Sequence, residues 1–118
     1  MTKITNYKWA IFIANLNPVK GSEQRGNRPV LVISDEDFNH TMPVVTILPL
    51  TSLKQGRKVY PNEALLSKGV ARLPNDSLVL AHQVRTISKA RLQKLLGCIK
   101  ETELMEAINN ALKIHLNL

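Results

Sequence analysis

The sequence has little from which a disulfide, a metal centre or a membrane span could be built. Its 118 residues include one cysteine and three histidines, so no internal disulfide can form and no familiar metal-ligand spacing is present. No apolar run approaches the roughly 20 residues that cross a bilayer, and Met1 to Asn6 lacks the hydrophobic stretch of a signal peptide. We therefore expect an intracellular, cytoplasmic protein that needs no cofactor, in which Cys98 is a small buried residue.

Acidic residues are also scarce. The chain carries 16 lysines and arginines against 9 aspartates and glutamates, which gives a formal net charge of +7. This surplus favours a polyanionic partner, either a nucleic acid or an acidic protein segment. The length and the 44% hydrophobic content suit one globular domain over residues 1–118.

Short apolar segments separated by turn residues predict a mainly β structure. Strands are expected at Trp9 to Leu16, Val30 to Ser34, Val44 to Leu50, Val59-Tyr60 with Glu63 to Leu66, and Leu78 to Val84. This spacing is typical of a barrel or a sandwich. Pro49 predicts a sheet edge or a bulge, because proline cannot donate to a ladder. A short helical turn is expected after Ser34 or Asp35, either of which could cap it.

The apolar period changes after residue 88, where two helices are expected. Ser88 can cap a helix over Lys89 to Leu96, which Gly97 would end, and a second helix is predicted from Glu101 to Leu116. The predicted fold is therefore a β-barrel with C-terminal helices.

The segment from Gly21 to Pro29 is a polar loop that leads into an apolar strand, and Arg28 is its candidate functional residue. The guanidinium offers a planar fork of donors for phosphate oxygens, and the following proline restricts the backbone of Arg28 to extended geometry. The alternative is an arginine that holds its own loop to a carboxylate.

Other polar residues near strand ends also have two interpretations each. Thr51 could donate its hydroxyl to a phosphate or cap a turn, and Glu23 could be an acid–base group or a salt-bridge partner. His82 and Gln83 would face opposite sides of a strand. The chain contains no HExxH, GxSxG or phosphate-loop motif that would indicate a different chemistry.

Five segments form a pattern in order and spacing. They are Asn17 to Gln24 with Arg28 to Ile33, Leu48 to Ser52, Asn75 to Leu80, Gln83 to Ile87, and Lys89 to Leu92. The pattern resembles the MazF/PemK family of type II toxin–antitoxin toxins, and the likeness covers nearly the whole chain. It implies an SH3-like β-barrel with C-terminal helices that forms a homodimer.

The resemblance also implies a function. Members are sequence-selective, metal-independent endoribonucleases that cut single-stranded mRNA and leave a 2′,3′-cyclic phosphate and a 5′-hydroxyl. The family's catalytic arginine and threonine fall on Arg28 and Thr51, and its loop acid falls on Glu23. Residues expected near the RNA are Ser22, Gln24, Arg25, Ser52, Gln83 and Arg85. The implied partner is a cognate antitoxin with an acidic, disordered tail, and toxin and antitoxin together would bind DNA.

In the implied reaction the 2′-hydroxyl of the RNA attacks the adjacent phosphorus. Arg28 and Thr51 suit stabilisation of charge on the phosphate oxygens. A free arginine has a pKa above about 12 and is a poor base, so Glu23 is the better candidate for proton removal.

The chain departs from the family pattern at its start. A basic-Gly-acidic triplet is common there, whereas this sequence has Lys8-Trp9-Ala10, and Asn15 stands where an acid is common. Two rival functions stay open: a toxin of the same barrel that poisons DNA gyrase by binding, and a member without catalysis that binds nucleic acid or protein. Arg28 together with Thr51 is the feature that a pure binder would not need.

Overall fold

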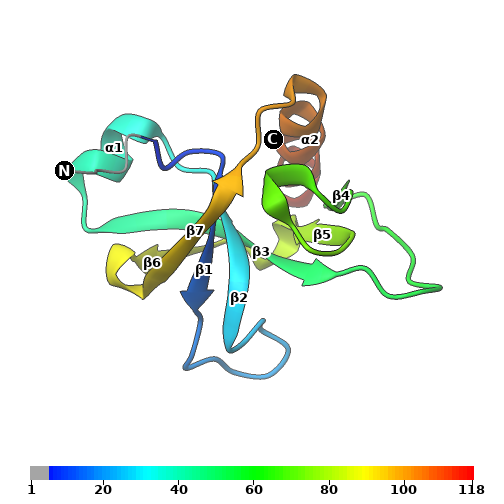
Figure 1. Cartoon of the computed structure of the whole chain (residues 1–118), viewed down its shortest axis with the longest axis horizontal. Helices are drawn as coiled ribbons and strands as arrows, with labels where there is room; N and C mark the ends of the chain where they lie inside the picture. The colour runs from blue at the N-terminus through cyan, green and yellow to red at the C-terminus, as the bar shows by residue number, and fades with distance from the viewer. Residues whose placement is uncertain (1–5) are drawn as a thin grey trace.

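One strongly bent antiparallel sheet forms most of the molecule (Figure 1). The structure is a computed structural model that describes residues 6–118, so the segment in which no signal peptide was expected lies almost entirely outside the described residues. The strand order is β4-β5-β3-β2-β1-β7, and β6 pairs with β3 beside this path. The strands are β1 (Ala10–Asn15), β2 (Asn27–Val32), β3 (Val44–Ser52), β4 (Glu63–Leu66), β5 (Ser77–Leu80), β6 (Arg85–Ser88) and β7 (Leu92–Cys98).

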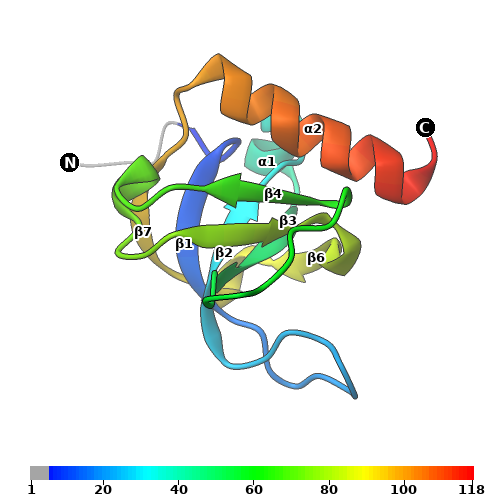
Figure 2. The same cartoon turned by 90° about the vertical axis from the view of Figure 1, so that its right-hand side faces the viewer.

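Helices join the strands and cover one side of the sheet. α1 (Glu36–Thr41) connects β2 to β3, and α2 (Thr102–Leu116) follows β7. The short 3-10 turns are η1 (Val70–Arg72), η2 (Ala81–Gln83) and η3 (Lys89–Arg91). Figure 2 shows α2 lying across β4, and α2 also contacts η2. Within residues 6–118, no helix has the length and apolar character needed to cross a membrane.

The central strands are buried on both faces, which explains their unbroken apolar runs. Successive residues of a strand point to opposite faces, and in β1 and β2 both sets are buried. One set includes Ile11 and Leu31 and packs with Ile108 of α2. The other includes Phe12 and Val30. The predicted SH3-like barrel class is confirmed as a barrel-like sheet, although the barrel stays open because its end strands, β4 and β7, do not pair.

The longest strand, β3, changes partners along its length. β6 pairs with residues 44–47 and β5 with residues 50–52, while β2 pairs with residues 47–49. The predicted edge or bulge at Pro49 is wrong, because β3 lies inside the sheet and its register with β2 is continuous there. Pro49 lies between the β6 and β5 ladders, so its missing N–H interrupts neither of them.

The helix predicted over Lys89 to Leu96 is also wrong. Ser88 does cap, since its hydroxyl oxygen accepts from the Ala90 amide at 3.2 Å, but the turn that it caps ends at Arg91. The following residues form β7, which pairs with β1 and has Leu95 opposite Phe12. The leucine spacing resembled one face of a helix, but the ladder with β1 satisfies the backbone of this segment and decides the outcome.

Gly97 therefore has a role other than ending a helix. A Cβ at this position would lie 2.7 Å from the carbonyl oxygen of Ala71. Glycine allows η1 to pack directly on β7, which places the segment between β4 and β5 against this edge of the sheet.

The strand predicted over Leu78 to Val84 is shorter than expected. β5 ends at Leu80, η2 intervenes, and β6 begins at Arg85. His82 and Gln83 consequently lie in a turn and do not alternate along a strand. The predicted strand at Val59-Tyr60 is likewise absent, since both residues lie in the loop before β4.

Two predicted helices are confirmed. The helix expected from Glu101 to Leu116 is α2, which has Glu101 as its N-cap residue. The helical turn is α1, which Asp35 caps by accepting from the Asp37 amide at 3.1 Å. Cys98 is only partly buried, at the end of β7.

The departure at the start of β1 has a structural cost. Trp9 occupies a position at which the MazF/PemK family, which this sequence resembles, often has glycine. The φ angle of Trp9 is +70°. A bulky side chain in this left-handed region is strained. The indole packs against the core cluster that contains Ile11, and the ammonium of Lys8 lies 5.7 Å from the ring centroid. Packing of the indole therefore compensates for a backbone conformation that glycine adopts more easily.

Candidate active site

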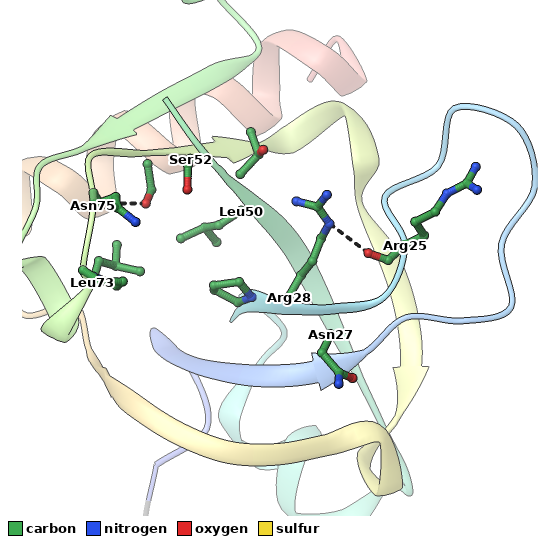
Figure 3. Close-up of a pocket in the computed structure, with 11 residues that line it drawn as sticks. Arg25, Asn27, Arg28, Leu50, Ser52, Leu73 and Asn75 are labelled. Atoms are coloured by element: carbon green, nitrogen blue, oxygen red, sulfur yellow. Dashed lines mark hydrogen bonds between the residues drawn. The ribbon is translucent and has the colours of Figure 1, made fainter. Parts of the chain in front are cut away.

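A small pocket opens where β2 begins and β3 ends (Figure 3). Its volume is about 210 Å³. We call it the strand-end pocket. Its lining comes from the loop before β2, the end of β3 and the segment that leads into β5, and consists of Arg25, Asn27, Arg28, Pro29, Leu50, Thr51, Ser52, Leu73, Pro74, Asn75 and Ser77.

Strand register brings Arg28 and Thr51 to this pocket. β2 and β3 are antiparallel, with Val30 opposite Pro49. The ladder between β2 and β3 ends at this pair. Arg28 and Thr51 lie two residues beyond it, each on the same side of its strand as Val30 or Pro49, and both line the pocket. The hydrophobic core ends between these positions, so this face becomes partly exposed at Arg28 and Thr51.

Arg28 is held by a backbone carbonyl and not by a carboxylate. Its Nε donates to the carbonyl oxygen of Arg25 at 2.9 Å, and within residues 6–118 it forms no salt bridge. The Arg25 side chain points away into the loop, where Nη2 donates to the Gly21 carbonyl oxygen at 2.8 Å (Figure 3). Both terminal nitrogens of Arg28 therefore remain available to the oxygens of a phosphate.

The Thr51 hydroxyl is available as well. It makes no hydrogen bond to any other described residue, so the alternative in which Thr51 caps a turn is wrong. Thr46, on the same strand, shows the contrast, because its hydroxyl lies 2.7 Å from that of Thr86.

A larger cavity shares Thr51 and Ser52 with the strand-end pocket. We call it the adjoining cavity, and its volume is about 600 Å³. Four predicted RNA-binding residues line it, namely Ser22, Gln24, Ser52 and Gln83. The side-chain oxygen Oε1 of Gln24 is buried and has no hydrogen-bond partner in the described part of the chain. A buried acceptor of this kind needs a donor from outside these residues, such as a water molecule or a bound ligand.

Two predicted site residues lie elsewhere. Glu23 lines neither hollow, and its Oε1 accepts from the Lys20 amide at 2.8 Å, which closes a turn of the loop. It forms no salt bridge within residues 6–118. Arg85 also lines neither hollow, and it donates to the Leu16 carbonyl oxygen at 3.3 Å, just after β1. The structure thus brings Arg28 to Thr51 but does not bring Glu23 to them.

A buried carboxylate supports the wall of the adjoining cavity. Glu63 is 6% exposed and accepts hydrogen bonds from Arg57 at 2.9 and 2.8 Å. The Nε2 atom of His82 lies 2.9 Å from its Oε2. We call these three residues the Glu63 network. The hydrogen bonds from Arg57 outweigh burial and lower the pKa of Glu63 to about 2, so this carboxylate is ionised at neutral pH and is unsuited to proton transfer.

Sequence reasoning missed several lining residues. Asn27 and Asn75 border the strand-end pocket, and Lys54 and Arg57 border the adjoining cavity. The turn that contains Gly56 gave the only signal, since two basic residues flank its glycine-containing tip. Within residues 6–118 no group of three or more His, Cys, Asp and Glu side chains could hold a metal ion.

Comparison of the sequence with known proteins identifies relatives. The profile of the family described as "PemK-like, MazF-like toxin of type II toxin-antitoxin system" matches residues 7–116. The chain is 36% identical over 108 residues to Endoribonuclease MazF of Staphylococcus epidermidis, a match that covers 92% of this chain and 88% of the relative. Endoribonuclease MazF of Staphylococcus saprophyticus is 35% identical over 108 residues with the same coverage.

Solved structures share the fold. The crystal structure of MazF from Deinococcus radiodurans matches with a TM-score of 0.81 and 24% identity, over 98% of this chain and 100% of that chain. An endoribonuclease from Mycobacterial species, solved in complex with its cognate antitoxin, matches with a TM-score of 0.76 and 22% identity over 94% of each chain. From the profile match and the sequence relatives, the chain belongs to the family of PemK-like, MazF-like toxins of type II toxin–antitoxin systems.

Proposed function

We propose that this toxin is a sequence-selective endoribonuclease that cuts single-stranded mRNA, with the scissile phosphate bound in the strand-end pocket. The proposal is carried by one observation: Arg28 and Thr51 line one small pocket, and within residues 6–118 neither the terminal nitrogens of Arg28 nor the Thr51 hydroxyl forms a hydrogen bond. The relatives named as endoribonucleases, at 35–36% identity over 108 residues, support the same activity. Cleavage of mRNA would stop translation and growth.

The reaction is an attack by the 2′-hydroxyl oxygen on the adjacent phosphorus. A new O2′–P bond forms, the P–O5′ bond breaks, and the products carry a 2′,3′-cyclic phosphate and a 5′-hydroxyl. Negative charge accumulates on the non-bridging oxygens as phosphorus becomes five-coordinate. Arg28 and the Thr51 hydroxyl stabilise that charge, and a donor of this kind contributes roughly 3–4 kcal/mol in comparable oxyanion sites.

One proton must leave the 2′-hydroxyl and another must reach the departing 5′-oxygen. Glu23 is the proposed base, because its carboxylate belongs to the loop that leads into the strand of Arg28. It must first release the Lys20 amide. Gly21 and Gly26, which flank this acid in the loop, adopt φ values of +56° and +77°, and glycine at such positions gives the loop the freedom that a closing movement requires.

Ser22, Gln24, Ser52 and Gln83 are proposed to contact the RNA strand on the side of the adjoining cavity. Arg25 lines the strand-end pocket and is proposed to contact the phosphate backbone. Arg85 is proposed to act more indirectly, by holding the residues that follow β1. Unstacked bases read on their edges would provide the sequence preference.

The proposed assembly is a cytoplasmic homodimer that is neutralised by a cognate antitoxin. The antitoxin found with the related Mycobacterial structure supports the partner. The net charge of +7 favours an acidic antitoxin tail that is disordered when free and orders along the cationic site. A complex held in this way weakens as salt concentration rises, and toxin with antitoxin would bind DNA.

The proposal is tested by incubating the purified protein with a long single-stranded RNA in EDTA and sequencing the new 5′ ends. We expect cleavage at a short recurring sequence and 5′-hydroxyl ends, and protein with Arg28→Ala, prepared in parallel, controls for contaminating nuclease. A 2′-deoxy nucleotide at the scissile position should block cleavage, whereas the same change elsewhere in the RNA should not. Intact RNA, or cleavage of the 2′-deoxy substrate, would contradict the proposed function.

A further inference from the structure

Arg57 separates two hollows of the protein surface. On one side it lines the adjoining cavity with Thr51 and Gln83. On the other it lines a hollow with Tyr60 and Ile114. The residue belongs to the loop between β3 and β4, and the active-site chemistry described above makes no use of it.

The guanidinium of Arg57 is held in a fixed plane. Nη1 lies 2.9 Å from Oε1 of Glu63 and Nη2 lies 2.8 Å from Oε2, which is the parallel two-bond geometry that orients an arginine most strongly. The Glu63 side chain is 1% exposed, whereas that of Arg57 is 33% exposed. A buried carboxylate on a strand thus fastens a loop residue to the sheet and leaves part of the guanidinium in solvent.

An aromatic ring lies beside this guanidinium. The Cζ atom of Arg57 lies 5.6 Å from the centroid of the Tyr60 ring, and Tyr60 belongs to the hollow on the far side from Thr51. Arg57 also lines the adjoining cavity, of which Tyr60 forms no part, so the ring leaves that side of Arg57 open. A guanidinium whose charge is balanced by a carboxylate holds phosphate weakly, but its flat face still suits a nucleobase, since unstacked RNA bases pack on arginine planes as well as on aromatic rings.

The volumes of the two hollows agree with a phosphate in the strand-end pocket and a base in the adjoining cavity. The strand-end pocket, at about 210 Å³, is smaller than the roughly 300–1,000 Å³ of common ligand sites and suits a phosphate group. The adjoining cavity, at about 600 Å³, can hold a base. Thr51 and Ser52 border both hollows. A base bound in the adjoining cavity would therefore belong to a nucleotide next to the phosphate in the strand-end pocket.

We infer that the Arg57–Glu63 pair is a preformed platform on which a nucleobase next to the scissile phosphate stacks. Arg57 contacts the base, and Glu63 is a positioning residue that acts through Arg57. This inference rests on the proposed function and adds a base-binding subsite to it.

The first test measures binding of a single-stranded RNA that carries a 2′-deoxy nucleotide at the scissile position. Arg57→Lys keeps the charge but loses the planar fork, and we expect it to weaken binding about tenfold or more, close to Arg57→Gln. Lys113→Gln, which removes one exposed positive charge from α2, is the control and should change binding less than about twofold. Binding by Arg57→Lys at the wild-type level would show that only charge matters and would overturn the platform.

The second test removes the base from the RNA. An abasic nucleotide is introduced in turn on each side of the scissile position. At one of them, binding to the wild-type protein should fall about tenfold, while binding to Arg57→Lys should fall no further, because the stacking partner is already lost. Equal losses for both proteins at every position would overturn the inference.

Two further measurements distinguish loss of the platform from loss of folding and from loss of the proposed activity. Glu63→Gln should weaken binding in the same direction as Arg57→Lys, and thermal unfolding identifies whether that buried variant folds. If it does not fold, Arg57→Lys carries the test alone. Failure of the wild-type protein to cleave any RNA would overturn the proposed function, whereas normal cleavage with normal binding by Arg57→Lys would overturn the platform only.

Discussion

Two arginines border the site, and they differ in what holds them. Arg28 donates one hydrogen bond to a carbonyl oxygen and has no salt bridge in the described part of the chain. Arg57 donates two hydrogen bonds to the buried carboxylate of Glu63. Both guanidiniums are positively charged at every relevant pH. The charge of Arg28 is uncompensated, whereas that of Arg57 is balanced locally.

Under the functions proposed above, this difference suits the two residues to different tasks. An uncompensated guanidinium attracts a phosphate and stabilises the additional charge of the transition state. A compensated one contributes a fixed plane and little net field, so it supports binding of a neutral group equally in the ground state and the transition state. Loss of Arg28 should therefore appear in kcat, and loss of Arg57 in KM.

The largest expected effect is that of Arg28→Ala. We expect kcat for a short RNA substrate to fall by about 10²–10³-fold or more, because the phosphate loses its principal charged donor. The thermal midpoint should change little, since the side chain is partly exposed and makes one protein hydrogen bond. Arg57→Ala is the matched variant and should raise KM while leaving kcat within about threefold. Equal losses of kcat in both variants would remove the distinction between the two arginines.

Thr51→Ala should have the next largest effect. Removal of the hydroxyl is expected to lower kcat by about 10²-fold, with folding preserved. Thr46→Ala is the control on the same strand, because its hydroxyl is already paired with that of Thr86, and it should lose up to about 1 kcal/mol of stability with normal cleavage. Wild-type activity in Thr51→Ala would show that Arg28 acts without this partner.

The third prediction concerns stability against pH. The pKa of Glu63 is lowered from 4.5 to about 2 by the hydrogen bonds from Arg57. The unfolded chain therefore binds a proton at higher pH than the folded chain does, so the contribution of Glu63 is present above pH 4.5 and is lost as pH falls towards 2. The loss is up to about 3 kcal/mol, measured as the change in urea-unfolding free energy with pH. Glu63→Gln should lack this part of the slope, whereas Glu106→Gln on the exposed side of α2 should keep it. An unchanged slope in Glu63→Gln would contradict the assignment.

The last prediction concerns Glu23→Gln, whose effect depends on a movement of the loop. If the loop closes as proposed, loss of the base lowers kcat by about 10²-fold, at the lower end of general-base contributions, while KM changes little. Glu106→Gln, which removes one exposed carboxylate from α2, is the control and should keep the wild-type kcat. A wild-type kcat in Glu23→Gln would exclude Glu23 as the base.

Local sequence predicted the lining of the strand-end pocket where polar residues adjoin the ends of strands. The proline after Arg28, the polar loop and the residues after Leu50 predicted the two sides of the strand-end pocket. The same reasoning wrongly predicted a helix for Leu92 to Gly97. Leucines at helical spacing are also compatible with a strand when a neighbouring strand is available to pair with it. Pairing with β1, which is distant in the sequence, determines that this segment forms a strand and not a helix.

The chain order of polar and apolar residues thus predicts a basic, mainly β domain with Arg28 and Thr51 near strand ends, and the family match identifies it as a toxin. Their meeting depends on the register of β2 against β3, which long-range packing of buried residues such as Val30 and Leu31 sets. The Glu63 network depends on the same kind of long-range placement, because it joins a loop, a strand and a turn that are separate in the sequence. Spacing along the chain identifies a donor, but only the folded sheet shows whether a carboxylate already occupies it.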